Sequence, residues 1–217
     1  TRPIGFQVTF FRVRTDVDPD NPSAFAARQL VIAHAALADP ARGRLLVDER
    51  IARTGFDLVQ AATGDTDVRL DGWSLARDAA TDTYRGRIAA RGVTLEFTAA
   101  ATGSPGLQGD AGVSSKGPLP TQASYYYSRP QLRVEAEVAV AAEAAPTARP
   151  RRSAFRRDPL NGIAWLDHEW SSSALAADAA GWDWIGMNLD DGTALLAFQI
   201  RLRGAGPDDT PLQRYAA

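Results

Sequence analysis

Apolar and polar residues alternate along much of the chain, which predicts a protein built from β-strands. In the segment GFQVTFFRVR at residues 5–14, Phe6 and Val8 alternate with polar neighbours, as in a strand with one buried face. The segment 28–39 is apolar on both faces except at one histidine, and its β-branched residues favour a strand over a buried helix. Residues 45–53 predict a further strand.

Two hairpins are predicted from their turn residues. Segments 83–102 and 182–203 each carry two strand-like runs around a short turn, and Gly92 and Gly192 can supply the positive φ that a tight turn needs. Residues 124–143 predict one long strand or two. Many short strands joined by glycine-containing turns indicate an antiparallel sandwich or barrel, and a barrel of about eight strands can enclose one small ligand.

Three segments depart from the strand pattern. Residues 174–180 are rich in alanine and predict a short helix between strands. Residues 103–121 contain too many Gly and Pro residues for a long element. Residues 144–159 combine Pro with several Arg and predict a loop or insertion, with a basic docking surface for an acidic partner as the alternative. We expect a single domain over residues 1–217.

The composition is that of an ordinary globular domain. The chain of 217 residues has 24 Lys+Arg and 26 Asp+Glu, and this balance argues against a nucleic-acid-binding protein, which usually has a strongly basic face. Cysteine is absent, which excludes disulfides, thiolate metal sites and cysteine nucleophiles. The longest uncharged stretch, residues 97–109, is shorter than the roughly 20 apolar residues of a membrane-spanning helix, so we expect no such helix.

The densest group of chemically active side chains lies at residues 164–184, AWLDHEWSSSALAADAAGWDW. This segment holds four of the five Trp and one of the two His of the chain. If its first part is a strand, alternation places Trp165, Asp167 and Glu169 on one face.

The same alternation places His168 and Trp170 together on the opposite face of that strand. From the next strand, Trp182 and Trp184 point together, with Asp183 on the other side. A histidine can exchange a proton near neutral pH, and a Trp ring attracts a cation by roughly 0.5–2 kcal/mol, enough to steady a carbocation formed by protonating an alkene. A carboxylic acid among Trp rings is a second possible proton donor. These residue types fit the addition of water to a carbon–carbon double bond.

Less specific interpretations remain open for each of these residues. Trp residues in strands commonly form a core, and acidic residues beside them can pair with Arg. His34 is more often a core histidine than a second polar group facing the same cavity as His168. Ser114 and Lys116 could gate a ligand from a loop, although such residues more often form turns. We find no metal-ligand spacing and no G-x-S-x-G nucleophile motif.

A set of short motifs spans nearly the whole chain. GFQVTFFRVR, AHAALAD, DGWSL, LQGDAGVSSKG, ASYYYSRP, WLDHEW and GWDWIGMNLDDG follow one another between residues 5 and 203. Each motif alone is weak, but the ordered set is specific. On these motifs the chain resembles the carotenoid 1,2-hydratase / AttH-like family, whose members are also described as lipocalin-like proteins and as predicted secreted hydrolases.

The resemblance implies an all-β, lipocalin-like antiparallel β-barrel, the first of two in tandem. It also implies a Trp-rich strand before residue 5 and a second barrel after residue 217, so we expect this chain to be incomplete at both ends, with the second lipocalin-like domain as its partner. Because members of the family are often exported, we expect a location in the cell envelope or periplasm, or secretion.

The implied activity is hydration of a double bond in an apolar isoprenoid-type substrate that is bound in the barrel, without cofactor or metal. The resemblance places the catalytic residues in DHEW, with His168 and Trp170 as the leading candidates, Asp167 or Glu169 as the acid, and Asp183 nearby. The expected substrate-binding residues are His34, Trp73, Tyr125, Tyr127, Trp182 and Trp184. The alternatives are a non-catalytic carrier of an apolar ligand and an ester hydrolase.

Overall fold

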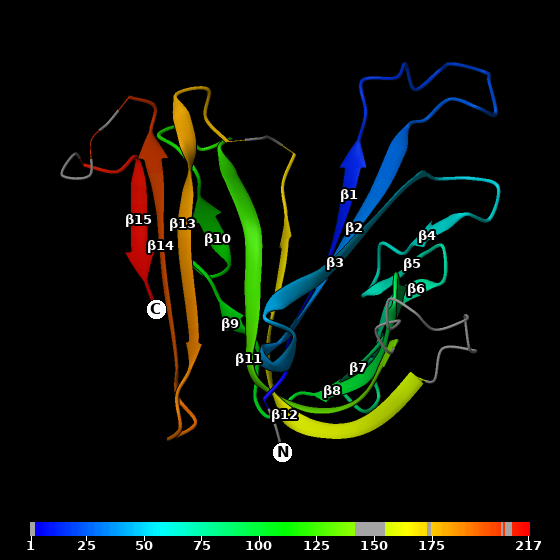
Figure 1. The fold of residues 1–217 in the computed structure, drawn as a ribbon. Coiled ribbons are helices and arrows are strands. Elements are labelled where there is room, and N and C mark those ends of the chain that lie inside the picture. Colours follow the sequence, from blue (N-terminus) through cyan, green and yellow to red (C-terminus); the bar gives the residue numbers. More distant parts are fainter. Residues whose placement is uncertain (1–2, 142–154, 173–174, 205, 207–209) are drawn as a thin grey trace. The chain divides into compact units, whose positions relative to one another are not determined.

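The structure is a computed structural model that describes residues 3–141, 155–172, 175–204, 206 and 210–217. Most of the predicted loop at 144–159 therefore lies outside the described residues. Apart from a single 3-10 turn at Pro40–Arg42, the regular elements are β-strands, and their described pairings are antiparallel (Figure 1). The all-β class predicted from the sequence is confirmed.

The chain divides into two compact units. Unit 1 comprises Thr1–Ala100 and Val134–Asn161, and unit 2 comprises Ala101–Arg133 and Gly162–Ala217. Two long strands contribute residues to both units. No helix among the described residues is long and apolar enough to span a membrane.

Unit 1 contains a three-stranded sheet and a series of consecutive hairpin strands. The sheet has the order β1-β2-β3, formed by β1 (Gly5–Arg14), β2 (Gln29–Asp39) and β3 (Arg44–Arg53). The series runs from β4 to β8, each strand paired with the next: β4 (Val59–Ala61), β5 (Asp67–Leu70), β6 (Trp73–Asp78), β7 (Thr83–Ala90) and β8 (Val93–Ala100). The hairpin predicted at residues 83–102 is confirmed by β7 and β8.

The core of unit 1 is formed by apolar side chains from its strands. Val31 and Ala33 of β2 are fully buried, and so is Trp73 of β6, whose indole N–H donates to the carbonyl oxygen of Ala89 at 3.0 Å. His34 follows Ala33 and therefore points to the opposite face. Its ring is exposed and meets Phe11 edge-on at 5.5 Å, so the interpretation of His34 as a core histidine is wrong.

Unit 2 contains a second three-stranded sheet, with the order β13-β14-β15. The sheet consists of β13 (Ala179–Asn188), β14 (Ala194–Leu202) and β15 (Gln213–Ala216). Two shorter strands of unit 2 are β9 (Gly106–Leu107) and β10 (Val113–Ser115). The hairpin predicted at residues 182–203 is confirmed by β13 and β14, with Gly192 at a φ of 86° in its turn. The core of this unit includes Leu196, Phe198 and Ile200 of β14.

The short helix predicted at residues 174–180 is absent from the described residues 175–180. Ala176 and Ala179 are both buried in the core of unit 2, and the amide of Ala179 donates to the carbonyl oxygen of Ala176 in a turn that leads into β13. Burial of these two side chains outweighs the helix propensity of a short alanine run.

Two long strands, β11 (Ala123–Ala141) and β12 (Phe155–Trp170), pair with each other. β11 is one continuous strand, one of the two alternatives predicted for residues 124–143. β12 begins at Phe155, so the expected loop at 144–159 is wrong for its last five residues. In the described sheet β12 pairs only with β11, and an edge strand of this kind tolerates Pro159.

We predict that Trp73→Ala lowers the free energy of unfolding by about 3–5 kcal/mol, because it leaves a large cavity in the core of unit 1. Trp182→Ala, at a side chain that is 57% exposed, serves as the matched control and costs less than about 1 kcal/mol. Urea denaturation followed by circular dichroism measures both. Equal losses would contradict the assignment of Trp73 to the core.

Candidate functional site

The predicted cluster in β12 has two faces, as strand alternation requires. We call Tyr125, Tyr127, His168 and Trp170 the aromatic face. We call the opposite side, with Trp165, Asp167 and Glu169 of β12 and their partners, the acidic face. Side-chain contacts occur within each face, so the division predicted from the sequence is confirmed.

Four rings meet on the aromatic face. The Tyr127 hydroxyl lies 2.9 Å from Nδ1 of His168, a hydrogen-bond distance. The ring of Trp170 meets His168 edge-on at 5.3 Å and stacks on Tyr125 at 5.5 Å. Tyr125 is 58% exposed and Trp170 is 51% exposed. This face therefore offers a ligand an apolar surface beside an imidazole that can give or take a proton.

On the acidic face, Asp167 is held by two hydrogen bonds to the same oxygen. The hydroxyl of Ser128 donates to Oδ1 at 2.6 Å, and the indole N–H of Trp165 donates to it at 2.8 Å. Ser128 in turn accepts from the side-chain amide of Gln108 at 3.1 Å. Ser128 and Gln108 are buried, so Asp167 is anchored to the interior of unit 2.

Glu169 also accepts a hydrogen bond from a serine of β11, and it pairs in addition with the ammonium of Lys116. Its Oε1 accepts from the hydroxyl of Ser124 at 2.5 Å and lies 2.7 Å from Nζ of Lys116. The Lys116 ammonium lies 4.3 Å from the ring centroid of Phe198 and 5.3 Å from that of Tyr126. A largely buried ammonium is stabilised by both a carboxylate and ring faces.

Tyr126 is buried at the centre of the acidic face. Its hydroxyl accepts from the indole N–H of Trp184 at 3.0 Å. Burial raises the pKa of the Tyr126 phenol above its ordinary value of 10.0, and the negative charge of Asp167 raises it further. Burial likewise raises the pKa of Tyr215, which lies 3.2 Å from the hydroxyl of Ser114. Both phenols therefore stay neutral at physiological pH.

Three of the other predicted site residues lie on β13 of unit 2. Asp183 is on the opposite side of β13 from Trp184, in an exposed ion pair with Arg201 at 3.2 Å. Trp182 shares the face of Trp184 by alternation. His34 and Trp73 belong to unit 1, whereas the aromatic face and the acidic face belong to unit 2.

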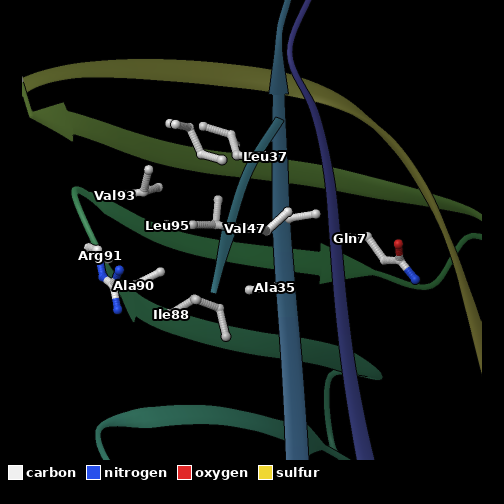
Figure 2. Close-up of a pocket in the computed structure, with 11 residues that line it drawn as sticks. Gln7, Ala35, Leu37, Val47, Ile88, Ala90, Arg91, Val93 and Leu95 are labelled. Carbon is white, nitrogen blue, oxygen red and sulfur yellow. The ribbon is translucent and has the colours of Figure 1, made fainter. Parts of the chain in front are cut away.

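A small pocket lies in unit 1 (Figure 2). It has a volume of about 20 Å³ and an apolar lining that includes Leu37, Ile88, Val93 and Leu95, with Arg91 at one side. A cavity of this size holds about one water molecule. None of the predicted site residues lines it, so it is not the binding site that the sequence predicts.

The sequence predicts site roles for Tyr125 and Tyr127 but not for Tyr126, the tyrosine on the acidic face. It does not single out Ser124 or Ser128 either, although alternation along β11 groups both with Tyr126. The signal for Lys116 is that it is the chain's one lysine. The described residues contain no group of three or more His, Asp or Glu side chains placed to hold a metal ion.

The model of the AttH-like family matches residues 1–212, and the chain belongs to that family. A crystal structure assigned as AttH from Nitrosomonas europaea is similar over 99% of this chain and 59% of that one, with 49% identity and a TM-score of 0.80. Kievitone hydratase from Nectria haematococca is similar over 97% of this chain and 55% of that one, with 15% identity and a TM-score of 0.63. The chain thus spans a little over half the length of these proteins. No curated protein matches it.

The family membership and these structures confirm the lipocalin-like fold class predicted from the sequence. At 15% identity, the likeness to kievitone hydratase concerns the fold alone.

We predict that the free energy of unfolding falls as the pH rises above about 10, by about 1 kcal/mol per pH unit from Tyr126. The reason is that tyrosines of the unfolded chain ionise there, while burial keeps the folded Tyr126 phenol neutral. Tyr126→Phe removes this contribution and flattens the pH dependence. Urea denaturation at pH 9 and pH 11 compares the two proteins, and an equal loss in both would contradict the prediction.

Proposed function

We propose that this chain is a hydratase domain, which adds water to a carbon–carbon double bond of an apolar isoprenoid-type substrate on its aromatic face. The contact between His168 and Tyr127 beside the exposed ring of Trp170 carries this proposal. The similar fold of kievitone hydratase supports it in a general way, since that protein is an enzyme named for hydration.

The chemistry needs one proton donor and one surface that tolerates positive charge. A protonated His168 transfers a proton to one alkene carbon, and the neighbouring carbon becomes a carbocation. In this scheme the electron-rich rings of Trp170 and Tyr125, which stack on each other at 5.5 Å, stabilise that cation. Water adds to the cation through its oxygen and loses one proton to the neutral imidazole. The product is an alcohol, and His168 regains its starting proton.

Tyr127 has a supporting role in this scheme. Its hydroxyl contacts Nδ1, so it fixes the orientation of the imidazole. Which of the two atoms donates depends on the protonation state of the imidazole, and a hydroxyl can serve either state because it both donates and accepts.

A non-catalytic carrier is the second candidate, and the exposure of Tyr125 and Trp170 favours it. Large exposed rings bind apolar ligands whether or not chemistry follows. The carrier predicts stoichiometric binding of an acyclic carotene without any product, whereas the hydratase predicts an alcohol.

We predict that His168→Ala lowers turnover of an acyclic carotene by about a hundredfold or more, because the proton donor is lost. Liquid chromatography with mass spectrometry detects the product that has gained one water. Glu96→Gln, in an exposed ion pair with Arg87 of unit 1, is the matched control and leaves turnover as in the wild type. Full turnover by the His168 variant would remove His168 from the mechanism.

We also predict that a substrate analogue with an ammonium group at the cationic carbon binds more tightly than its uncharged carbon isostere. The expected ratio is about two- to thirtyfold, from the strength of a cation over a Trp ring. Trp170→Leu removes the preference while Trp170→Phe keeps part of it. Isothermal titration calorimetry measures these affinities, and equal binding of both analogues by the wild type would contradict carbocation stabilisation.

A further inference from the structure

We infer that Asp167, Glu169 and Lys116 are positioning residues, which hold His168 against Tyr127 from the opposite face of β12, and that the two carboxylates are not the proton donors. This inference rests on the proposed function for its catalytic readout. It reassigns the two acids that the sequence predicts as catalytic candidates.

The two carboxylates bracket His168 along the strand. Asp167 precedes it and Glu169 follows it, so alternation points both away from the aromatic face. Each accepts a short hydrogen bond from a serine of β11, from Ser128 at 2.6 Å and from Ser124 at 2.5 Å.

The serines bracket Tyr127 from the other strand. Ser124 and Ser128 have relative exposures of 4% and 1%, so both anchors are buried. Two buried serines at separate points along β11 therefore hold the DHEW segment of β12 by hydrogen bonds. The contact between His168 and Tyr127 lies on the opposite face of the two strands from these hydrogen bonds.

The aromatic face benefits from such an anchor because Tyr127 and His168 are only half-buried. A shift of one residue between paired strands would move His168 to the other face, and smaller displacements would break its contact with Tyr127. Tyr125 and Trp170 are more than half exposed and can supply little packing that resists such shifts. The backbone pairing of β11 and β12 sets the register, and the hydrogen bonds on the acidic face help to hold the side chains of the aromatic face in place.

Lys116 adds a third tie, from the loop that follows β10. It is the chain's one lysine among 24 basic residues, and its side chain is only 12% exposed. The compact ammonium bonds Glu169 and lies over the ring of Phe198, a position that the larger planar guanidinium of arginine fills poorly. Lys116 thereby links Glu169 to the core of unit 2.

Isosteric amides separate positioning from proton donation. Asp167→Asn and Glu169→Gln keep an oxygen that accepts the serine hydrogen bond, but neither amide can donate a proton as an acid does. Asp167→Ala and Glu169→Ala lose the hydrogen bond as well. A positioning role predicts that the amides are much less harmful than alanine, whereas a proton-donor role predicts that both are equally harmful.

The first readout needs no turnover. The chain has two histidines, so the imidazole nitrogen spectrum of 15N-histidine-labelled protein contains two sets of signals, and those of exposed His34 in unit 1 serve as the internal reference. Circular dichroism reports whether each variant is folded. We expect the His168 signals to move toward those of a solvated ring in the two alanine variants and in Lys116→Met. In the two amide variants we expect them to stay close to the wild-type positions.

The second readout is kcat and KM with an acyclic carotene. We expect each alanine variant to lower kcat by up to about a hundredfold, the loss that a misplacement of about 1 Å can cause. The KM should change little, because the exposed rings that bind substrate remain. Each amide variant should exceed the matching alanine variant in kcat by about tenfold or more, and Lys116→Arg should restore part of what Lys116→Met loses. Glu96→Gln is again the control.

Two results would overturn the inference. One is a His168 spectrum that is unchanged in folded alanine variants. The other is an amide variant with wild-type His168 signals but the same loss of kcat as alanine, which would make that carboxylate the acid. If the alanine variants do not fold, the amide variants still decide between the two roles. Failure of the proposed function can be told apart from failure of this inference. It appears as full turnover by His168→Ala or as no turnover by the wild type. The spectra test the positioning role in either case.

Discussion

The local structure of the candidate site depends on the side-chain hydrogen bonds between β11 and β12. Buried serines of β11 hold Asp167 and Glu169 of β12 on one face, and this fixes which residues of the two strands meet on the other. The contact between Tyr127 and His168, and the ring of Trp170 beside it, follow from that register. The serine-held carboxylates on one face and the exposed aromatic rings on the other are therefore two consequences of one strand pairing.

Much of the fold is readable from the sequence because strands impose a period of two on their residues. The runs around Gly92 and Gly192 form the expected hairpins, and the parity of residues 165–170 assigns each side chain to its face. The failures have local causes. Among the described residues 175–180 no helix forms, because Ala176 and Ala179 are buried in a turn. The prediction of a buried His34 fails because a strand that is apolar on both faces does not reveal which face is covered.

The candidate site is predictable in part. The DHEW motif identifies the strand, and the aromatic residues near it do converge. Periodicity within one strand cannot show which loop reaches it, so the ion pair between Lys116 and Glu169, two residues far apart in the sequence, appears only in the folded chain. For the same reason Asp183 looked like a member of the cluster, while strand pairing places it beside Arg201 on another face. Membership in the AttH-like family is shown over nearly the whole chain, and hydration remains our proposal for it.

The source of the proton distinguishes this account from a binding function most directly. Turnover of an acyclic carotene in heavy water, with the product examined by mass spectrometry and NMR, tests it in one measurement. Transfer from His168, whose proton exchanges with solvent, predicts one deuterium on the carbon adjacent to the new hydroxyl-bearing carbon. Recovery of the carotene unchanged, or an alcohol without carbon-bound deuterium, would contradict acid-catalysed hydration at the aromatic face.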